Sequence, residues 1–157
     1  MLTTDLQRNL VNYSVANAGH ETSRGYISLS RIGECDQIIY DHMIWGYPAS
    51  IEDRLKFGIG YDLERAMLDR LHLAFATQFT RGPEITAYNG LVQGHTDALI
   101  SRDLIEIKTV GREEYIPVDR KLPNKTFYQV QAYLHFLQDK GVKYAHVIYV
   151  ARDTGAI

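Results

Sequence analysis

The sequence predicts an α+β fold (α/β in the broader sense) in which helices flank a mixed central sheet. Three observations support this prediction. Apolar residues recur at helical spacing before residue 82, short β-prone runs separated by turn residues fill residues 84–110, and a helical run and then a β-prone run follow residue 124. The expected order is therefore helix, three-strand antiparallel meander, helix, strand.

The first part of the chain is expected to be helical. A polar extension of residues 1–25 contains a candidate helix over Leu6–Ala18, and a second helix is expected to begin at a Ser30 cap. Ser50 and Asp53 are typical of a third helix start, because a serine acceptor is followed three residues later by an acid. This third helix carries an apolar stripe made of Leu63, Met67, Leu71, Ala74 and Phe75.

Glycines and a proline mark expected boundaries in this region. Gly58 and Gly60 predict a break in the third helix or a close approach of another backbone. Gly82 and Pro83 together predict the end of the helical section.

The three strands of the meander follow. Glu84–Tyr88 and Leu91–Ile100 are expected to form a hairpin, because Asn89-Gly90 between them supplies the positive φ values of a tight turn. A turn at residues 101–103 leads into the third strand, Leu104–Val110.

A helix and a strand are expected to complete the fold. After a loop over residues 111–124, a helix capped by Asn124 or Thr126 should run to Lys140, where Gly141 stops it. Tyr144–Val150 is expected to be a buried strand. Because no repeat or long linker interrupts the chain, residues 1–157 are expected to form a single domain with its core over residues 28–153.

Composition and charge exclude several classes of protein. With 17 Lys and Arg against 19 Asp and Glu, the net charge of −2 lacks the basic excess of a protein that coats DNA, but it is compatible with a carboxylate metal site. The single cysteine, Cys35, excludes internal disulfides and is expected to be a small buried hydrophobe. No apolar run is long enough to span a membrane or to form a signal peptide, so we expect a cytoplasmic protein with no membrane partner.

The residues that suggest chemistry lie on two neighbouring strands. Along the third strand, Glu106 and Lys108 point to one face while the isoleucines between and before them point to the other. Asp97 lies on the preceding strand, on one face with His95 and Leu99. Since a short turn joins the two strands as antiparallel neighbours, Asp97 is expected to lie close to Glu106.

Two carboxylates held close together repel each other unless a cation lies between them. Hard oxygen ligands select Mg²⁺ or Mn²⁺, and Lys108 beside them can offset charge, orient a water molecule and contact a phosphate oxygen. The arrangement suits metal-assisted hydrolysis of a phosphodiester. The plainer alternative is that Glu106 and Lys108 form an ordinary solvated strand face.

Further polar residues are candidates for substrate binding. Gln129 and Tyr133 lie one turn apart on one helix face and are expected to reach toward a phosphate or the scissile nucleotide, unless they simply border the core. His95 could contact metal or phosphate, or could be a packed or surface residue. Lys125 could meet a phosphate near the start of the same helix.

The order and spacing of these residues resemble a known superfamily. Asp97, then eight residues, then Glu106-Ile107-Lys108 is similar to the signature of the PD-(D/E)XK nucleases. Gly60 followed by Glu64, and the Gln129–Tyr133 motif, resemble two helical motifs of its RecB-like branch, which includes lambda-type exonucleases and CRISPR-associated adaptation nucleases. The resemblance covers about residues 28–153.

The resemblance implies a restriction-endonuclease-like core and a specific site. Asp97, Glu106 and the carbonyl of Ile107 would hold Mg²⁺ or Mn²⁺, and Glu64 would complete or tune the site. Lys108 would orient the hydrolytic water, and Gln129 with its partner at position 133 would position the substrate backbone. Several relatives bind an iron–sulfur cluster through four cysteines, but this chain has one cysteine and no such cluster is expected.

The resemblance implies a single-domain, divalent-metal-dependent nuclease. The favoured mode of action is that of an exonuclease, and DNA is favoured over RNA as the substrate. The protein would be of viral or prokaryotic type and would be connected with DNA repair or recombination. It would be located in the cytoplasm, or in the host cytoplasm if viral, and it is compatible with a homo-oligomer or a recombination partner protein. One alternative is a non-catalytic nucleic-acid-binding or assembly subunit that retains the fold. Another is a metal hydrolase acting on a small phosphate ester.

Overall fold

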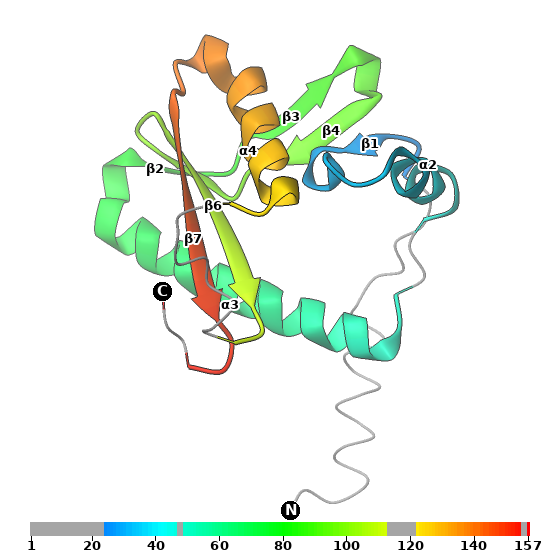
Figure 1. Cartoon of the computed structure of the whole chain (residues 1–157). Helices are drawn as coiled ribbons and strands as arrows, with labels where there is room; N and C mark the ends of the chain where they lie inside the picture. The colour runs from blue at the N-terminus through cyan, green and yellow to red at the C-terminus, as the bar shows by residue number, and fades with distance from the viewer. Residues whose placement is uncertain (1–23, 47–48, 113–121, 155–156) are drawn as a thin grey trace, which may run out of the picture.

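The computed structural model describes residues 24–46, 49–112, 122–154 and 157 (Figure 1). The candidate helix over Leu6–Ala18 lies outside these residues. The helices and strands, in chain order, are β1 Ile27–Ser28, α2 Asp36–Trp45, α3 Ile51–Phe75, β2 Phe79–Arg81, β3 Glu84–Ala87, β4 Val92–His95, β5 Ala98–Ile100, β6 Asp103–Val110, α4 Asn124–Leu137 and β7 Tyr144–Ala151.

The main sheet has four strands in the order β2-β5-β6-β7. Strands β2, β5 and β6 form an antiparallel meander, whereas β7 pairs with β6 in parallel along its full length. A parallel pair needs a crossover connection, and α4 supplies it between β6 and β7. The expected α+β fold with a mixed sheet is therefore confirmed.

The two long helices cover opposite faces of this sheet (Figure 1). Ile105 and Ile107 of β6 point toward α3 and pack against Met67 and Leu68. Leu104 points the other way and packs with the apolar residues of α4. The alternation of β6 thus directs its even-numbered side chains, including Glu106, toward α4.

The composition of the meander differs from the sequence prediction. Its first strand is β2, not Glu84–Tyr88, and the predicted strand Leu91–Ile100 is divided into β4 and β5. Strands β3 and β4 do form the hairpin expected at Asn89-Gly90, but they belong to a separate three-stranded sheet with the order β1-β4-β3. The prediction placed the end of the helical section at Gly82 and so missed β2. A strand of only three residues is too short to show the alternation by which strands are recognised in a sequence.

The two sheets meet where the chain crosses itself at Gly82. A Cβ atom at Gly82 would lie 1.3 Å from the carbonyl oxygen of Thr96, so only glycine fits at this crossing. The amide of Gly82 donates to the carbonyl of Asp97 at 3.0 Å, and the amide of Thr96 donates to the carbonyl of Pro83 at 3.4 Å. This crossing breaks the predicted strand between β4 and β5, and it leaves Asp97 at the break.

Helix α3 begins as expected and continues further than expected. The amide of Asp53 donates to the Ser50 hydroxyl at 3.1 Å, which confirms the Ser50 cap. The predicted break at Gly58 and Gly60 is wrong, because the helix is continuous through both. A close approach does exist at Gly60, where an added Cβ would lie 2.9 Å from Oγ1 of Thr109 on β6.

Not every residue of the predicted α3 stripe is in the core. Met67 is buried and Leu71 packs beside it, whereas Ala74 and Phe75 at the end of the helix are exposed. The buried Leu68, which the prediction omitted, contacts the sheet instead.

Several predicted caps are also wrong. Helix α2 begins at Asp36, not after Ser30, because Leu29 is inserted in the core and residues 29–31 form a short 3₁₀ turn around it. Pro123, rather than Asn124 or Thr126, stands at the cap position of α4.

Two predictions of burial are wrong as well. Cys35, directly before the first turn of α2, is exposed rather than buried. Strand β7 is buried only at its end, Val150 and Ala151, because it forms one edge of the sheet. Among the helices that the structure describes, none combines the length and the apolar character needed to cross a membrane.

Candidate functional site

A cleft of about 710 Å³ opens between α3, the carboxyl end of β6 and the first turns of α4. Glu64 of α3, Lys108 of β6 and Gln129 of α4 lie in its wall. The cleft also carries three further cations, Lys56, Lys125 and Arg152. Three elements that are distant in the sequence therefore bring polar and charged groups to one place.

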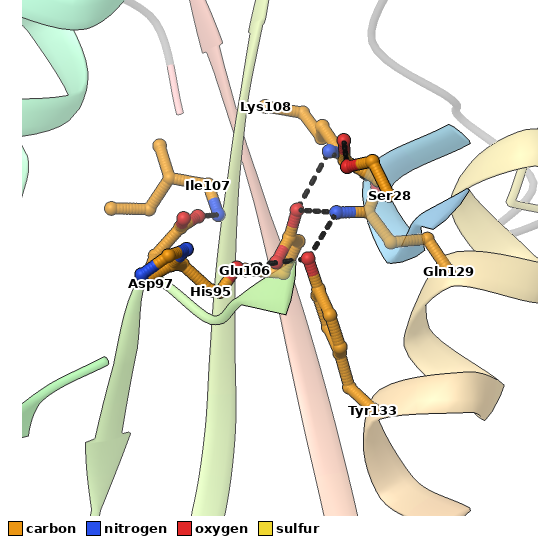
Figure 2. A network of polar contacts seen from close by, with 9 residues as sticks. Ser28, His95, Asp97, Glu106, Ile107, Lys108, Gln129 and Tyr133 are labelled. Carbon is orange, nitrogen blue, oxygen red and sulfur yellow. Dashed lines mark hydrogen bonds and ion pairs between the residues drawn. The ribbon is translucent and has the colours of Figure 1, made fainter. Parts of the chain in front are cut away.

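Glu106 is the most unusual residue of this region. Its side chain is buried at 2% exposure, and its Oε1 accepts hydrogen bonds from Nζ of Lys108 at 2.6 Å and from Nε2 of Gln129 at 2.7 Å (Figure 2). Its second oxygen, Oε2, is buried and has no hydrogen-bond partner among the described residues. A buried carboxylate oxygen without a hydrogen-bond donor destabilises the folded state, and a cation bound to Oε2 would offset this cost.

Asp97 approaches the same strand from the break between β4 and β5. Its Oδ2 accepts a hydrogen bond of 2.5 Å from the backbone amide of Ile107, as Figure 2 shows. This bond holds the carboxylate of Asp97 beside Ile107, the residue that follows Glu106. The expected approach of Asp97 to Glu106 is thus present in the structure.

Three carboxyl groups influence one another here. Burial, together with the charge of Asp97, raises the pKa of Glu106 to about 7 against the opposing effect of Lys108. Burial and the charge of Asp97 also raise the pKa of Glu64 to about 7. The pKa of Asp97 itself is raised by burial, although the hydrogen bond from Ile107 counteracts this. The site therefore disfavours the negative charge that carboxyl groups ordinarily carry at neutral pH.

These residues fit a divalent cation of the Mg²⁺ or Mn²⁺ type. The donor set consists of hard carboxylate and carbonyl oxygens, and a cation would relieve both the unpaired Oε2 of Glu106 and the repulsion between the carboxyl groups. Within the described part of the chain, no group of three or more His, Cys, Asp or Glu side chains is already gathered as a complete ligand set. Backbone and water oxygens would therefore have to contribute, as is common for Mg²⁺.

Gln129 in the cleft wall and Tyr133 behind it form a hydrogen-bonded network with Glu106. Nε2 of Gln129 bonds both Glu106 and the Tyr133 hydroxyl, at 2.7 Å and 3.1 Å, while its Oε1 accepts from Lys108 at 2.8 Å. The Tyr133 hydroxyl donates to the carbonyl of His95 at 2.8 Å. Burial raises the pKa of this hydroxyl above its usual range, so it remains a donor.

The position of Tyr133 corrects the expectation that both residues reach past the core edge. Tyr133 is only 1% exposed and faces the core side of the network, and Gln129 is only 3% exposed although it contributes to the cleft wall. What the sequence did not reveal is that the pair forms a connected chain from α4 to Glu106 and β4.

The two remaining candidates occupy different surroundings. The side chain of His95 is exposed, and it is the backbone carbonyl of this residue that joins the network. Lys125 lies in the cleft wall and forms an ion pair with Glu34, which also binds Arg31 at 3.1 Å. Glu34 was not identified from the sequence.

Sequence reasoning also missed two aromatic residues in the cleft wall, Phe57 and Tyr61. They precede Glu64 by seven and three residues and share its face of α3. This helical spacing from Glu64 was the signal that could have identified them.

Comparisons with known proteins establish the fold and no more. No protein-family model matches the sequence, and no curated protein matches it. The crystal structure of SSO0001 is similar, with a TM-score of 0.64 and 18% sequence identity, over 96% of this chain and 75% of that chain. At this identity the similarity shows a shared fold.

Proposed function

We propose that this protein is a divalent-metal-dependent nuclease that hydrolyses phosphodiester bonds, with DNA as substrate and an exonuclease mode of action. The observation that carries the proposal is the buried Glu106, whose Oε2 has no partner among the described residues. Glu106 lies close to Asp97 and is bonded to Lys108, which belongs to the wall of a cleft that also carries Lys56, Lys125 and Arg152. The preference for DNA and for ends comes from the resemblance to RecB-like PD-(D/E)XK nucleases.

Each acidic residue has a proposed part in holding the metal. Asp97, Glu106 and the carbonyl oxygen of Ile107 would bind Mg²⁺ or Mn²⁺, and Glu64 in the cleft wall would bind directly or through water. When bound, the metal would polarise the phosphoryl group and lower the pKa of the attacking water. The ion pair between Lys108 and Glu106 keeps an ammonium at the edge of this site, where it can orient a water molecule or contact a phosphate oxygen.

The surroundings of the site favour a polymeric phosphodiester over a small ester. Lys56, Lys125 and Arg152 are distributed around the cleft in addition to Lys108, although the whole chain has a net charge of −2. Cations placed around one cleft can contact several successive phosphates, whereas a small ester offers only one phosphate.

The proposal is tested with end-labelled linear DNA and closed circular DNA, each single-stranded and double-stranded, incubated with Mg²⁺ or Mn²⁺. We expect degradation of linear substrates and none in EDTA. Asp97→Ala, Glu106→Gln and Lys108→Ala should each lower the rate at least about 100-fold, the usual scale for loss of an electrostatic or proton-transfer group.

Asp103→Asn provides the matched control. Asp103 is an acidic residue at the other end of the same strand, in an exposed pair with His146, and its loss should leave the rate unchanged. If the wild type degraded no substrate, or if Asp97→Ala cleaved as fast as the wild type, the proposed activity would be wrong. Tight DNA binding without cleavage would instead favour the non-catalytic subunit.

A further inference from the structure

Two exposed aromatic side chains line the cleft beside Glu64. Phe57 is 58% exposed and Tyr61 is 62% exposed, and both belong to the cleft wall. Residues four apart on a helix are neighbours, so the two rings stand one turn from each other along α3. Glu64 follows on the same face, at the next turn toward the site.

Neither ring belongs to the buried core clusters of the described residues. Helix α3 packs against the sheet through Met67 and Leu68, which lie further along the helix and are buried. Exposing two large rings to water is unfavourable for the folded state by itself, because the free energy falls when apolar surface is removed from water. The rings stand in a cleft together with Lys56 and Lys125, so the occupant should combine flat apolar surfaces with negative charge.

We infer that Phe57 and Tyr61 form a stacking platform for unpaired bases, so that the substrate enters the cleft as a single strand; this inference rests on the proposed nuclease function. Aromatic side chains bind single strands because every base has a face on which a ring can stack, while cations hold the backbone. In a duplex the neighbouring base pairs cover those faces. The platform therefore selects strands whose bases are already unstacked, and it delivers the backbone toward the carboxylates.

The test separates base contacts from phosphate contacts. We would measure fluorescence anisotropy of a labelled oligothymidine strand and of an abasic strand of equal length, in EDTA and at one fixed salt concentration. The wild type should bind the oligothymidine at least tenfold more tightly than the abasic strand. Phe57→Ala and Tyr61→Ala should each weaken oligothymidine binding roughly tenfold and leave abasic binding unchanged.

Ile59 supplies a matched control on the same helix. It is 53% exposed but does not contribute to the cleft wall, so Ile59→Ala should change neither affinity. Phe57→Leu, which keeps apolar bulk without a ring, should behave like the alanine variant, and Phe57→Trp should retain wild-type binding. Lys125→Ala should weaken both strands by the same factor, since a phosphate contact does not depend on the base.

The outcomes distinguish this inference from the proposed function. Equal wild-type affinity for the two strands, or equal effects of the Phe57 and Ile59 variants, would overturn the platform even if the protein cleaves DNA. A labelled duplex of the same length, measured in the same way, should bind more weakly than the oligothymidine, and the opposite preference would overturn the platform as well. If the wild type bound no oligonucleotide and cleaved none, the platform and the nuclease function would both be wrong.

Discussion

At the residue scale, the site depends on one buried glutamate with two different oxygens. Oε1 of Glu106 is held by Lys108 and Gln129, which leaves Oε2 as the atom without a partner among the described residues. Had both oxygens been bonded within the protein, the residue would be a satisfied structural carboxylate. The unequal surroundings of the two oxygens are what favours the proposed metal site over a structural ion pair.

The raised pKa of Glu106 predicts how pH affects the stability of the metal-free protein. Its pKa is about 7 in the folded state against an ordinary 4.5, so between these values the folded state keeps a proton that the unfolded state loses. The free energy of unfolding should therefore fall as pH rises from 4.5 to 7. Glu106→Gln cannot titrate and should remove this loss.

The measurement is the melting temperature in EDTA at several pH values. The difference between Glu106→Gln and the wild type should grow in favour of the variant by several degrees from pH 5 to pH 8. Groups remote from Glu106 titrate equally in both proteins and cancel in the difference, whereas Asp97 and Glu64, which interact with Glu106, contribute to it. A constant difference across this range would show that Glu106 is already ionised at low pH.

At the scale of elements, α4 positions the site on β6. Gln129 and Tyr133 stand one turn apart and connect α4 to Glu106 and to the carbonyl of His95. The helix therefore both covers the sheet and sets the orientation of the glutamate.

Tyr133→Phe tests this connection. The ring stays in the core, but the His95 carbonyl loses its donor and Gln129 loses an acceptor, which should cost about 1–3 kcal/mol of unfolding free energy. Urea denaturation measures this cost. The proposed nuclease activity should also fall, at constant substrate affinity, because Glu106 is held less firmly.

Tyr128→Phe is the control for this prediction. It removes the same hydroxyl from an exposed tyrosine of the same helix, so stability and activity should both remain at the wild-type level. Equal losses from the two variants would mean that the buried network contributes nothing specific.

The contact between α3 and β6 predicts different effects for two neighbouring glycines. A Cβ at Gly58 meets nothing within 4 Å, so Gly58→Ala should stabilise the protein by about 0.5–1 kcal/mol through helix propensity. At Gly60 the Cβ would lie 2.9 Å from Oγ1 of Thr109, so Gly60→Ala should gain less or lose stability.

Chemical denaturation of both variants measures this contrast. In a Thr109→Ala background the obstructing hydroxyl is absent, and Gly60→Ala should then recover the gain seen at Gly58. An equal gain from Gly60→Ala in the wild-type background would mean that α3 does not need the close approach.

At the scale of the whole molecule, metal binding should be linked to folding. The residues that would hold the metal come from β6, from the break between β4 and β5, and from α3, and only the folded chain brings them together. A ligand that binds the folded state alone stabilises it by about 2.7 kcal/mol at 100 times its dissociation constant.

Mn²⁺ should therefore raise the melting temperature of the wild type by several degrees. Asp97→Ala should abolish the shift, whereas Asp103→Asn should keep it. Isothermal titration with Mn²⁺ gives an independent measurement on the same proteins. Equal heats for the wild type and Asp97→Ala would rule out the proposed site.

Local patterns were sufficient for much of the fold. The Ser50 cap, the turn at Asn89-Gly90, the alternation along β6 and the left-handed Gly141 after α4 all depend on neighbours within a few residues, and each is present in the structure. The same alternation placed Glu106 and Lys108 on one face, which is why the centre of the candidate site was predictable.

What the sequence by itself determined was which side chains lie near one another along a single element or across a short turn. Only the tertiary structure decided that Gly82 crosses Thr96 and divides one predicted strand between two sheets, that Tyr133 is buried under Glu106, and that Phe57 and Tyr61 share a cleft with Lys125. The reason is physical: periodicity records which face of an element a residue occupies, but the partner of that face depends on long-range packing.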